Sequence, residues 1–267
     1  MSVKQPNFLF FFPDQHRYDW TEANSSLPVR TPNLERLNRR GVRFTRAYTP
    51  SPLCAPARAC LASGRGYEQC GVPDNTRDYP ISAPTYYQKL RDVGYRVAGV
   101  GKFDLHKATL DWGPDGSRML EEWGFTDGID NEGKFDGSSS YRKNKKPMGP
   151  YLRFLADRGL ADEYAEEHLQ NGENRNAYTT SLPDDAYCDN WITRNGLDIL
   201  ESIPAGTPWH LVVNFAGPHN PMDVTEKMRE RWEGVDFPPP VGVTEPRSTD
   251  SSYGRRNDYS AEDLLPN

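Results

Sequence analysis

The sequence predicts an α/β protein built on a mostly parallel sheet that is sandwiched between helices. Three short apolar runs, at residues 8–12, 95–100 and 211–215, have the length and the β-branched or aromatic content of buried strands. Stretches with a helical pattern lie between them. Continuous apolar strands that alternate with helices are typical of a parallel sheet covered on both faces. A chain of 267 residues is also long enough to bury a sizeable core.

Helix signals separate the three predicted strands. Helices are expected over residues 32–37, 83–93 and 184–202. Glycine or proline follows each of these segments, as is usual where a helix ends. One more helix is expected to begin near Cys54, because Pro56 suits a first helical turn. The pattern therefore supplies helices for both faces of the sheet.

The middle of the chain and its last residues have a different character. Residues 107–183 contain many turn signals and are predicted to form a loop-rich excursion over the sheet, with one amphipathic helix within 150–169. Residues 241–267 form a polar tail, in which Ser260 begins a pattern that opens a helix shortly before the last residue. The domain is therefore expected to be truncated at its C-terminus, and a disordered tail is the alternative.

Composition excludes some classes of partner. With 38 acidic and 32 basic residues the net charge is −6, which argues against a nucleic-acid surface. No apolar run approaches the roughly 20 residues that span a bilayer, so no membrane partner is expected. The apolar run near the N-terminus is too short for a signal peptide. We therefore expect a cytoplasmic protein, in which the four cysteines are not paired.

Unusual polar residues follow each of the three predicted strands. Asp14 comes after the first strand, Lys102 after the second and His219 after the third. In parallel sheets, ligands bind outside the carboxyl ends of the strands. The sequence therefore predicts a binding or catalytic site at this edge of the sheet.

Cys54 has three interpretations on the residues alone. It is a buried structural thiol, a nucleophile of the Cys-His kind, or a metal ligand. Its place at the start of a predicted helix puts it where free backbone amides favour an anion, and Arg58 adds a positive charge one turn later. No histidine lies near it in the sequence to activate the thiol.

The segment around Cys54 also carries a resemblance to a known family. Residues 54–58 (CAPAR), with Ser-Gly-Arg at 63–65, resemble the signature of the type I sulfatases of the alkaline phosphatase superfamily. Residues 31–48 resemble the approach to that signature. The similarity implies that a separate formylglycine-generating enzyme oxidises Cys54 to formylglycine, whose hydrated aldehyde attacks the sulfur of a sulfate ester. It also implies an alkaline phosphatase-like or sulfatase-like fold.

The same resemblance implies a metal site. Asp14 and Gln15, with the modified Cys54, would hold Ca2+, with Mg2+ or Mn2+ as competitors. The family commonly has two consecutive acids here, whereas Asp14-Gln15 also resembles the branch that includes phosphonate and phosphate ester hydrolases. A helix cap or turn former is the ordinary alternative for Asp14.

Four further residues receive roles from the resemblance. Arg58 would support the hydrated aldehyde, Lys102 would hold the sulfate oxygens, and His219 would contact the bridging ester oxygen and assist the leaving group. The family histidine two positions after the lysine is Asp104 here, and His106 lies two residues further on. His106 is a candidate substrate-binding residue, with an ordinary loop histidine as the alternative.

The hypothesis from the sequence is a sulfuric ester hydrolase acting on a sulfated small molecule or sugar. Residues 1–267 would be the amino-terminal part of its catalytic domain, because no further cation ligands or second lysine follow residue 222 in a strand-like context. Two alternatives stay open. One is a phosphonate or phosphate ester hydrolase of the same superfamily, and the other is an inactive, truncated remnant.

Overall fold

The computed structural model describes residues 5–24, 26–171 and 177–239. Two compact units divide the chain: Met1–His16 with Thr45–Met228, and Arg17–Phe44 with Arg229–Asn267. In the described ranges no helix has both the length and the apolar character that crossing a membrane requires. The predicted polar tail at 241–267 lies outside the described residues.

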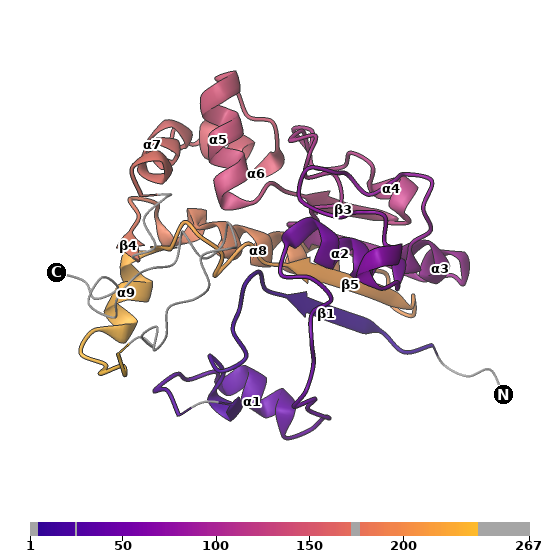
Figure 1. Ribbon diagram of the computed structural model, residues 1–267, viewed down its shortest axis with the longest axis horizontal. Helices are drawn as coiled ribbons and strands as arrows, with labels where there is room; N and C mark the ends of the chain where they lie inside the picture. Colours follow the sequence, from indigo (N-terminus) through magenta and orange to yellow (C-terminus); the bar gives the residue numbers. More distant parts are fainter. Residues whose placement is uncertain (1–4, 25, 172–176, 240–267) are drawn as a thin grey trace, which may run out of the picture. The chain divides into compact units, whose positions relative to one another are not determined.

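The first unit is built on a four-stranded parallel sheet. Its strand order is β1-β5-β2-β3 (Figure 1). The bounds are β1 Phe8–Phe12, β2 Arg96–Gly101, β3 Asp127–Asp130 and β5 Trp209–Asn214. Three of these strands confirm the predicted positions, β1 with the same ends and β2 and β5 with slightly displaced ends. The expectation that all three are buried is wrong for β1, which lies at the edge of the sheet with Phe8, Leu9 and Phe11 exposed. The fourth, β3, was not predicted, because its sequence Asp-Gly-Ile-Asp contains a single apolar residue.

Helices cover both faces of the sheet, as predicted. The main ones are α2 Cys54–Ser63, α3 Tyr86–Asp92 and α8 Cys188–Glu201. Alternate strand residues point to opposite faces, so Val97 and Val212 pack in one core cluster with α2 and α3. Val100 and Val213 pack in the other cluster, with α8. The α/β fold class with a parallel sheet between helices is therefore confirmed.

The segment 107–183 is richer in regular structure than the sequence indicated. It contains α4 Leu120–Trp123, β3, α5 Lys134–Asn144, α6 Pro150–Asp157, α7 Ala161–Asn171 and β4 Tyr178–Thr179. The expectation of one helix within 150–169 is wrong, because α6 ends at Asp157 and α7 begins at Ala161. Helices α5, α6 and α7 pack together (Figure 1).

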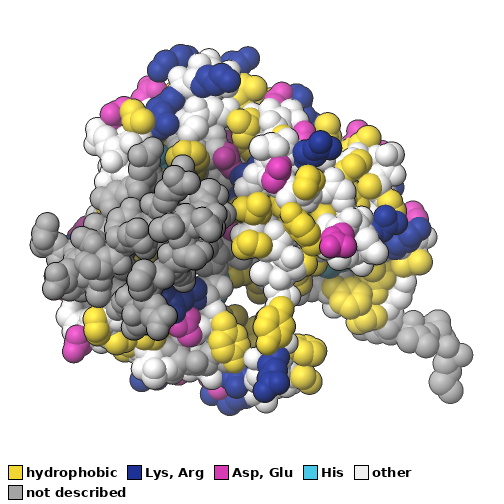
Figure 2. Space-filling model, in the orientation of Figure 1, with side chains coloured by type: hydrophobic (Ala, Val, Ile, Leu, Met, Phe, Trp, Pro, Cys, Tyr) yellow, Lys and Arg dark blue, Asp and Glu magenta, His cyan; other side chains and the backbone are white. Residues whose placement is uncertain are grey.

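Basic side chains gather at the C-terminal end of α5, where the negative end of the helix dipole stabilises positive charge. Figure 2 shows dark blue side chains over the region of α5, at the top of the view. The basic residues at that end of α5 are Arg142, Lys143, Lys145 and Lys146.

Short elements complete the two units. Strand β6, Asp223–Val224, pairs in parallel with β4, and α9 spans Glu226–Trp232. In the second unit, α1 Pro32–Asn38 confirms the predicted helix, although none of its side chains is buried. The rings of Trp20 and Phe237 stack with centroids 5.8 Å apart in the same unit.

Candidate active site

Helix α2 places Cys54 at its first turn. The preceding residue, Leu53, is extended and its carbonyl accepts the amide of Ala57 at 3.0 Å, so the helix begins at Cys54. The next amide, of Ala55, donates to the side-chain oxygen of Asn75 at 3.0 Å. Cys54 is half-buried, and like the other three cysteines it is free. The predicted position at the start of a helix is confirmed.

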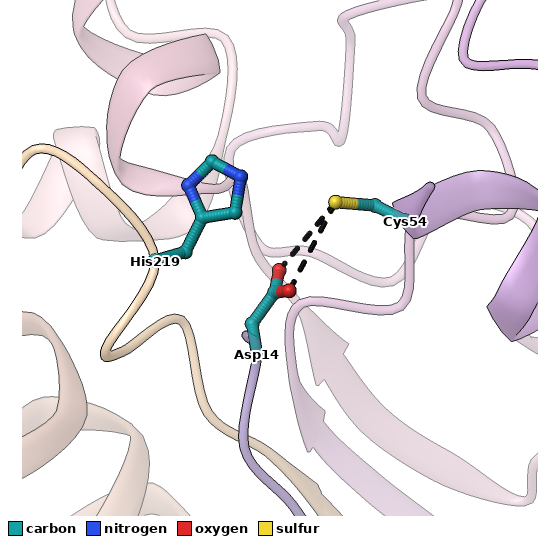
Figure 3. A group of neighbouring side chains, drawn as sticks. All are labelled: Asp14, Cys54 and His219. Carbon is teal, nitrogen blue, oxygen red and sulfur yellow. Dashed lines mark hydrogen bonds between the residues drawn. The ribbon is translucent and has the colours of Figure 1, made fainter. Parts of the chain in front are cut away.

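The three predicted polar residues come together at the carboxyl ends of their strands. The amide of Asp14 donates to the Gly217 carbonyl at 3.1 Å, which ties the end of β1 to the loop that follows β5. Ligand atoms of Asp14, Cys54 and His219 all lie within 4.8 Å of one another. Figure 3 shows these side chains converging from three separate segments.

Lys102 is at the centre of the charged groups. Its ammonium group donates to the Asp14 carboxylate, lies 3.5 Å from the Cys54 sulfur and lies 3.2 Å from the Asp104 carboxylate. The Arg58 guanidinium lies 3.5 Å from the same Asp14 carboxylate and donates to the Lys102 carbonyl. Both cations therefore face one carboxylate, immediately beside the thiol.

These charges and the burial of the site set the protonation states. Burial acts to raise the pKa of Asp14, but the charges of Lys102 and Arg58 bring it below its usual value. Burial raises the pKa of Cys54, despite the opposing charge of Lys102, so the unmodified residue is a neutral thiol near neutral pH. A Cys-His nucleophile requires a lowered thiol pKa, which is the opposite of the shift at Cys54.

His219 has one defined tautomer. Its Nδ1 lies 2.7 Å from the Asn220 carbonyl oxygen, which only accepts hydrogen bonds, so Nδ1 carries the proton. Burial, followed by the charge of Lys102, lowers the pKa of His219. The ring is then neutral near pH 7, and Nε2 presents a lone pair to a cation or to an incoming group.

The turn from β2 into Lys102 requires glycine. Gly101 has a φ of +108°, and a Cβ there would lie 1.9 Å from the Asn214 carbonyl oxygen. That same oxygen accepts the Lys102 amide at 2.9 Å. The close approach of the two backbones therefore fixes where the lysine leaves the sheet.

His106 does not lie in the cavity beside Cys54, in contrast to its predicted contact with substrate. It is fully buried, and its Nε2 lies 2.8 Å from Asp130. The other oxygen of Asp130 accepts the amide of Phe103 at 3.1 Å. We therefore assign His106 and Asp130 a positioning role, in which they hold the segment that follows Lys102.

Gln15 adjoins Asp14, but its side chain is exposed and its φ is +62°. The neighbouring histidine, cysteine and acidic ligand atoms come from Asp14, Cys54 and His219. The structure thus adds His219 to the candidate cation ligands, which the sequence had limited to Asp14, Gln15 and Cys54.

Several cavity residues were not identified from the sequence. A cavity of about 190 Å³ is lined by Cys54, Lys102 and His219. Two further lysines also line it, Lys107 and Lys134. Lys107 directly follows the segment that carries Lys102, which was an available signal, whereas Lys134 lies in the stretch predicted to be loop.

Asp189, in the first turn of α8, anchors the loop that leads to His219. Its carboxylate accepts the amides of Ala216 at 2.9 Å and Gly217 at 3.1 Å. Because the Gly217 carbonyl in turn accepts the Asp14 amide, one half-buried carboxylate supports both His219 and Asp14. This role was not predictable from the sequence, because an acid at the start of a helix is ordinary.

The fold and the site define an α/β protein with a cluster of paired charges beside Cys54 at the carboxyl ends of parallel strands. The chain belongs to the Sulfatase family, whose model matches residues 6–258. It is 30% identical over 252 residues to choline-sulfatase of Rhizobium meliloti (strain 1021). That alignment covers 91% of this chain and 44% of the relative.

Solved structures show the same fold. Phosphonate monoester hydrolase of Agrobacterium radiobacter superposes with a TM-score of 0.65 at 20% identity, over 91% of this chain and 47% of that one. A structure described as a complex with its substrate D-glucosamine-2-N,6-O-disulfate gives a TM-score of 0.62 at 21% identity, over 91% and 41%. The chain thus spans less than half the length of these three relatives.

Proposed function

We propose that this chain carries the sulfate-binding and nucleophile segments of a sulfuric ester hydrolase, acting on a sulfated small molecule or sugar. The observation that supports the proposal is the convergence of Asp14, Lys102 and His219 on Cys54 from separate segments, with Arg58 of the same helix as Cys54 paired to Asp14. In the reaction, the bond between sulfur and the bridging oxygen breaks, an oxygen from water ends on sulfur, and the alcohol takes up a proton. Membership of the Sulfatase family supports the same class.

We propose that position 54 is formylglycine in the working protein, formed from Cys54 by a formylglycine-generating enzyme. The modified side chain supplies an oxygen nucleophile, which a neutral buried thiol does not. Arg58 and Lys102 lie against the acid that faces this position, so they are placed to hold an anion there. A compact ammonium charge suits a tetrahedral anion.

The donor set fits a divalent cation once position 54 is modified. With the thiol, the ligand atoms of Asp14, Cys54 and His219 are oxygen, sulfur and nitrogen, a set typical of zinc. Replacing sulfur by oxygen shifts the preference toward the harder ions Ca2+, Mg2+ or Mn2+, of which we propose Ca2+. A cation there would draw charge from a sulfate oxygen. Asp14 is its best-placed ligand, because its pKa is lowered and it is ionised.

His219 is the proposed group at the leaving oxygen, and in that role its Nε2 does not bind the cation, which Asp14 and the modified position 54 would hold. Its Nδ1 proton is held by the Asn220 carbonyl, so Nε2 is the atom that would exchange a proton with the alcohol. Its lowered pKa makes the imidazolium a stronger acid than usual, so a proton on Nε2 would pass readily to the departing oxygen.

The proposal is tested by mass spectrometry of the tryptic peptide 47–58 after co-expression with a formylglycine-generating enzyme. We expect the mass of the aldehyde or its hydrate, together with hydrolysis of 4-nitrophenyl sulfate. Cys54→Ala is the control and should abolish both signals. An unmodified thiol would remove this mechanism from the chain. Conversion without hydrolysis would favour the inactive remnant.

A phosphonate or phosphate ester hydrolase is the second candidate, because Gln15 places a neutral amide beside Asp14 where the family commonly has two acids. The fold is compatible with either class, as the phosphonate monoester hydrolase structure has it too. Matched 4-nitrophenyl sulfate and 4-nitrophenyl phosphonate esters separate the two. A higher kcat/KM with the phosphonate ester would favour this candidate.

A further inference from the structure

Lys107 is a second cation in the cavity beside Cys54, and the proposed function gives it no role. It lines the same cavity as Lys102, and its side chain is 11% exposed. The side chain of Lys102 is 3% exposed. Two ammonium groups are rarely placed together at so little exposure without anions to balance them.

Asp104 supplies part of that balance and connects the two lysines. Its carboxylate lies 3.2 Å from the Lys102 ammonium and 3.4 Å from the Lys107 ammonium. Asp104 is itself buried, with a φ of +51°. A single fixed carboxylate therefore sets the relative positions of both cations.

The other partner of Lys107 is less buried. Asp136, at the start of α5, contacts the Lys107 ammonium, lines the cavity and has a side chain 21% exposed. The Lys107 ammonium thus has one deeply buried counter-ion, Asp104, and one at the cavity wall, Asp136. An anion entering the cavity competes with Asp136 for the lysine and leaves the bridge through Asp104 intact.

Lys107 also lies near the reacting groups, because it lines the same cavity as Cys54 and His219. A charge that develops between these two residues is therefore within reach of its ammonium group.

We propose that Lys107 and Lys102, bridged by Asp104, form a two-lysine clamp for two oxygens of the tetrahedral anion. This inference rests on the proposed function, and it adds Lys107 as a substrate-binding residue and Asp104 as a positioning residue. A sulfate ester presents three non-bridging oxygens, so two point charges bind it in one orientation and leave the third oxygen for other groups.

The test uses the full chain made without the modifying enzyme, so that no turnover is involved. Inorganic sulfate is titrated into the wild type and into Lys107→Met, Lys107→Arg and Lys89→Met, with calorimetry as the readout. Lys107→Met should weaken sulfate binding about tenfold or more, the value for a lost hydrogen bond to a charged group. Lys107→Arg should restore most of it. Lys89→Met, at an exposed position on α3, should bind like the wild type.

Two results would overturn the clamp: a wild type that binds no sulfate, or a Lys107→Met variant that binds it as tightly as the wild type. Circular dichroism establishes that this variant is folded. If it is not, Asp136→Asn takes its place and should bind sulfate several-fold more tightly, because Lys107 loses its competing partner. Unchanged or weaker binding in Asp136→Asn would also overturn the clamp.

The same variants separate this inference from the proposed function. Loss of sulfate binding in Lys107→Met, with no ester hydrolysis by the modified wild type, would leave the clamp standing and refute the hydrolase. Hydrolysis by the modified wild type, with unchanged sulfate binding in Lys107→Met, would refute the clamp and leave the hydrolase standing.

Discussion

Glu132 gives the protein a pH-dependent stability near neutrality. It lies between β3 and α5, is 1% exposed, and accepts the amide of Leu152 in the first turn of α6 at 2.8 Å. Burial raises its pKa from 4.5 to about 7, against the opposing hydrogen bonds from backbone amides. The substitution that tests this is Glu132→Gln, which keeps an acceptor for the Leu152 amide and does not ionise.

The sign and size of the effect follow from the two pKa values. The folded state holds the Glu132 proton more tightly than the unfolded state, so its stabilising contribution is complete below pH 4.5. It is lost as the pH rises through about 7. A rise from 4.5 to about 7 corresponds to about 3 kcal/mol in the free energy of unfolding. The Gln variant should therefore gain about this much relative to the wild type between pH 4.5 and pH 8.

Urea unfolding followed by far-UV circular dichroism at four or five pH values measures the effect. Glu163→Gln, at an exposed position on α7, is the matched control and should follow the wild type at every pH. Parallel stability curves for wild type and Glu132→Gln would refute the reasoning. The result matters for the site, because the chain continues from Glu132 directly into Lys134 and Asp136, which line the cavity.

Four other predictions follow from the site. Gly101→Ala should destabilise the protein by about 3 kcal/mol or more in urea unfolding, because the added Cβ would meet the Asn214 carbonyl. Gly94→Ala is its control: Gly94 also has a positive φ but open space around it, so the free energy of unfolding should fall by only about 1 kcal/mol. His106→Phe should cost about 3 kcal/mol by the same measurement, since Asp130 is left buried without its partner. Asp189→Ala should lower kcat/KM of the modified enzyme about tenfold by releasing the loop of His219, and Asp189→Asn, which keeps an acceptor, should recover most of it. Ca2+ should strengthen sulfate binding at least about fivefold in calorimetry, and equal sulfate affinities with and without Ca2+ would contradict coupling between the Asp14 and Lys102 sites.

The fold was predictable where burial dictates the residue type. Strands β2 and β5 are central and buried, and the sequence identified both of them. Strand β1 was identified from its apolar run as well, although it lies at the edge of the sheet and Phe8, Leu9 and Phe11 are exposed. Strand β3 is at the edge of the sheet and is held mainly by backbone pairing to β2, so acidic residues at both its ends are tolerated. Helices α6 and α7 were predicted as one helix, because the apolar pattern continues across the short turn that separates them.

The site was predictable only in part, for a physical reason. Asp14, Lys102 and His219 each follow a recognisable strand, and parallel strands bring their carboxyl ends to one edge. Asp189 acts through backbone amides that are distant in sequence. A contact of this kind has no periodicity and no characteristic spacing, so it is visible only in three dimensions. The buried pair of His106 and Asp130 belongs to the same class.

The pairing of Lys102 with Asp14 indicates how the site would bind two ligands together. The Lys102 ammonium donates to the Asp14 carboxylate, and each group partly neutralises the other. In the proposed function a sulfate would use Lys102 and a cation would use Asp14, so binding of either one would break the pair and leave the other group available. A cation at Asp14 therefore spares the sulfate the cost of separating the pair, and sulfate does the same for the cation. Because such coupling is reciprocal, each ligand should raise the affinity of the other by the same factor.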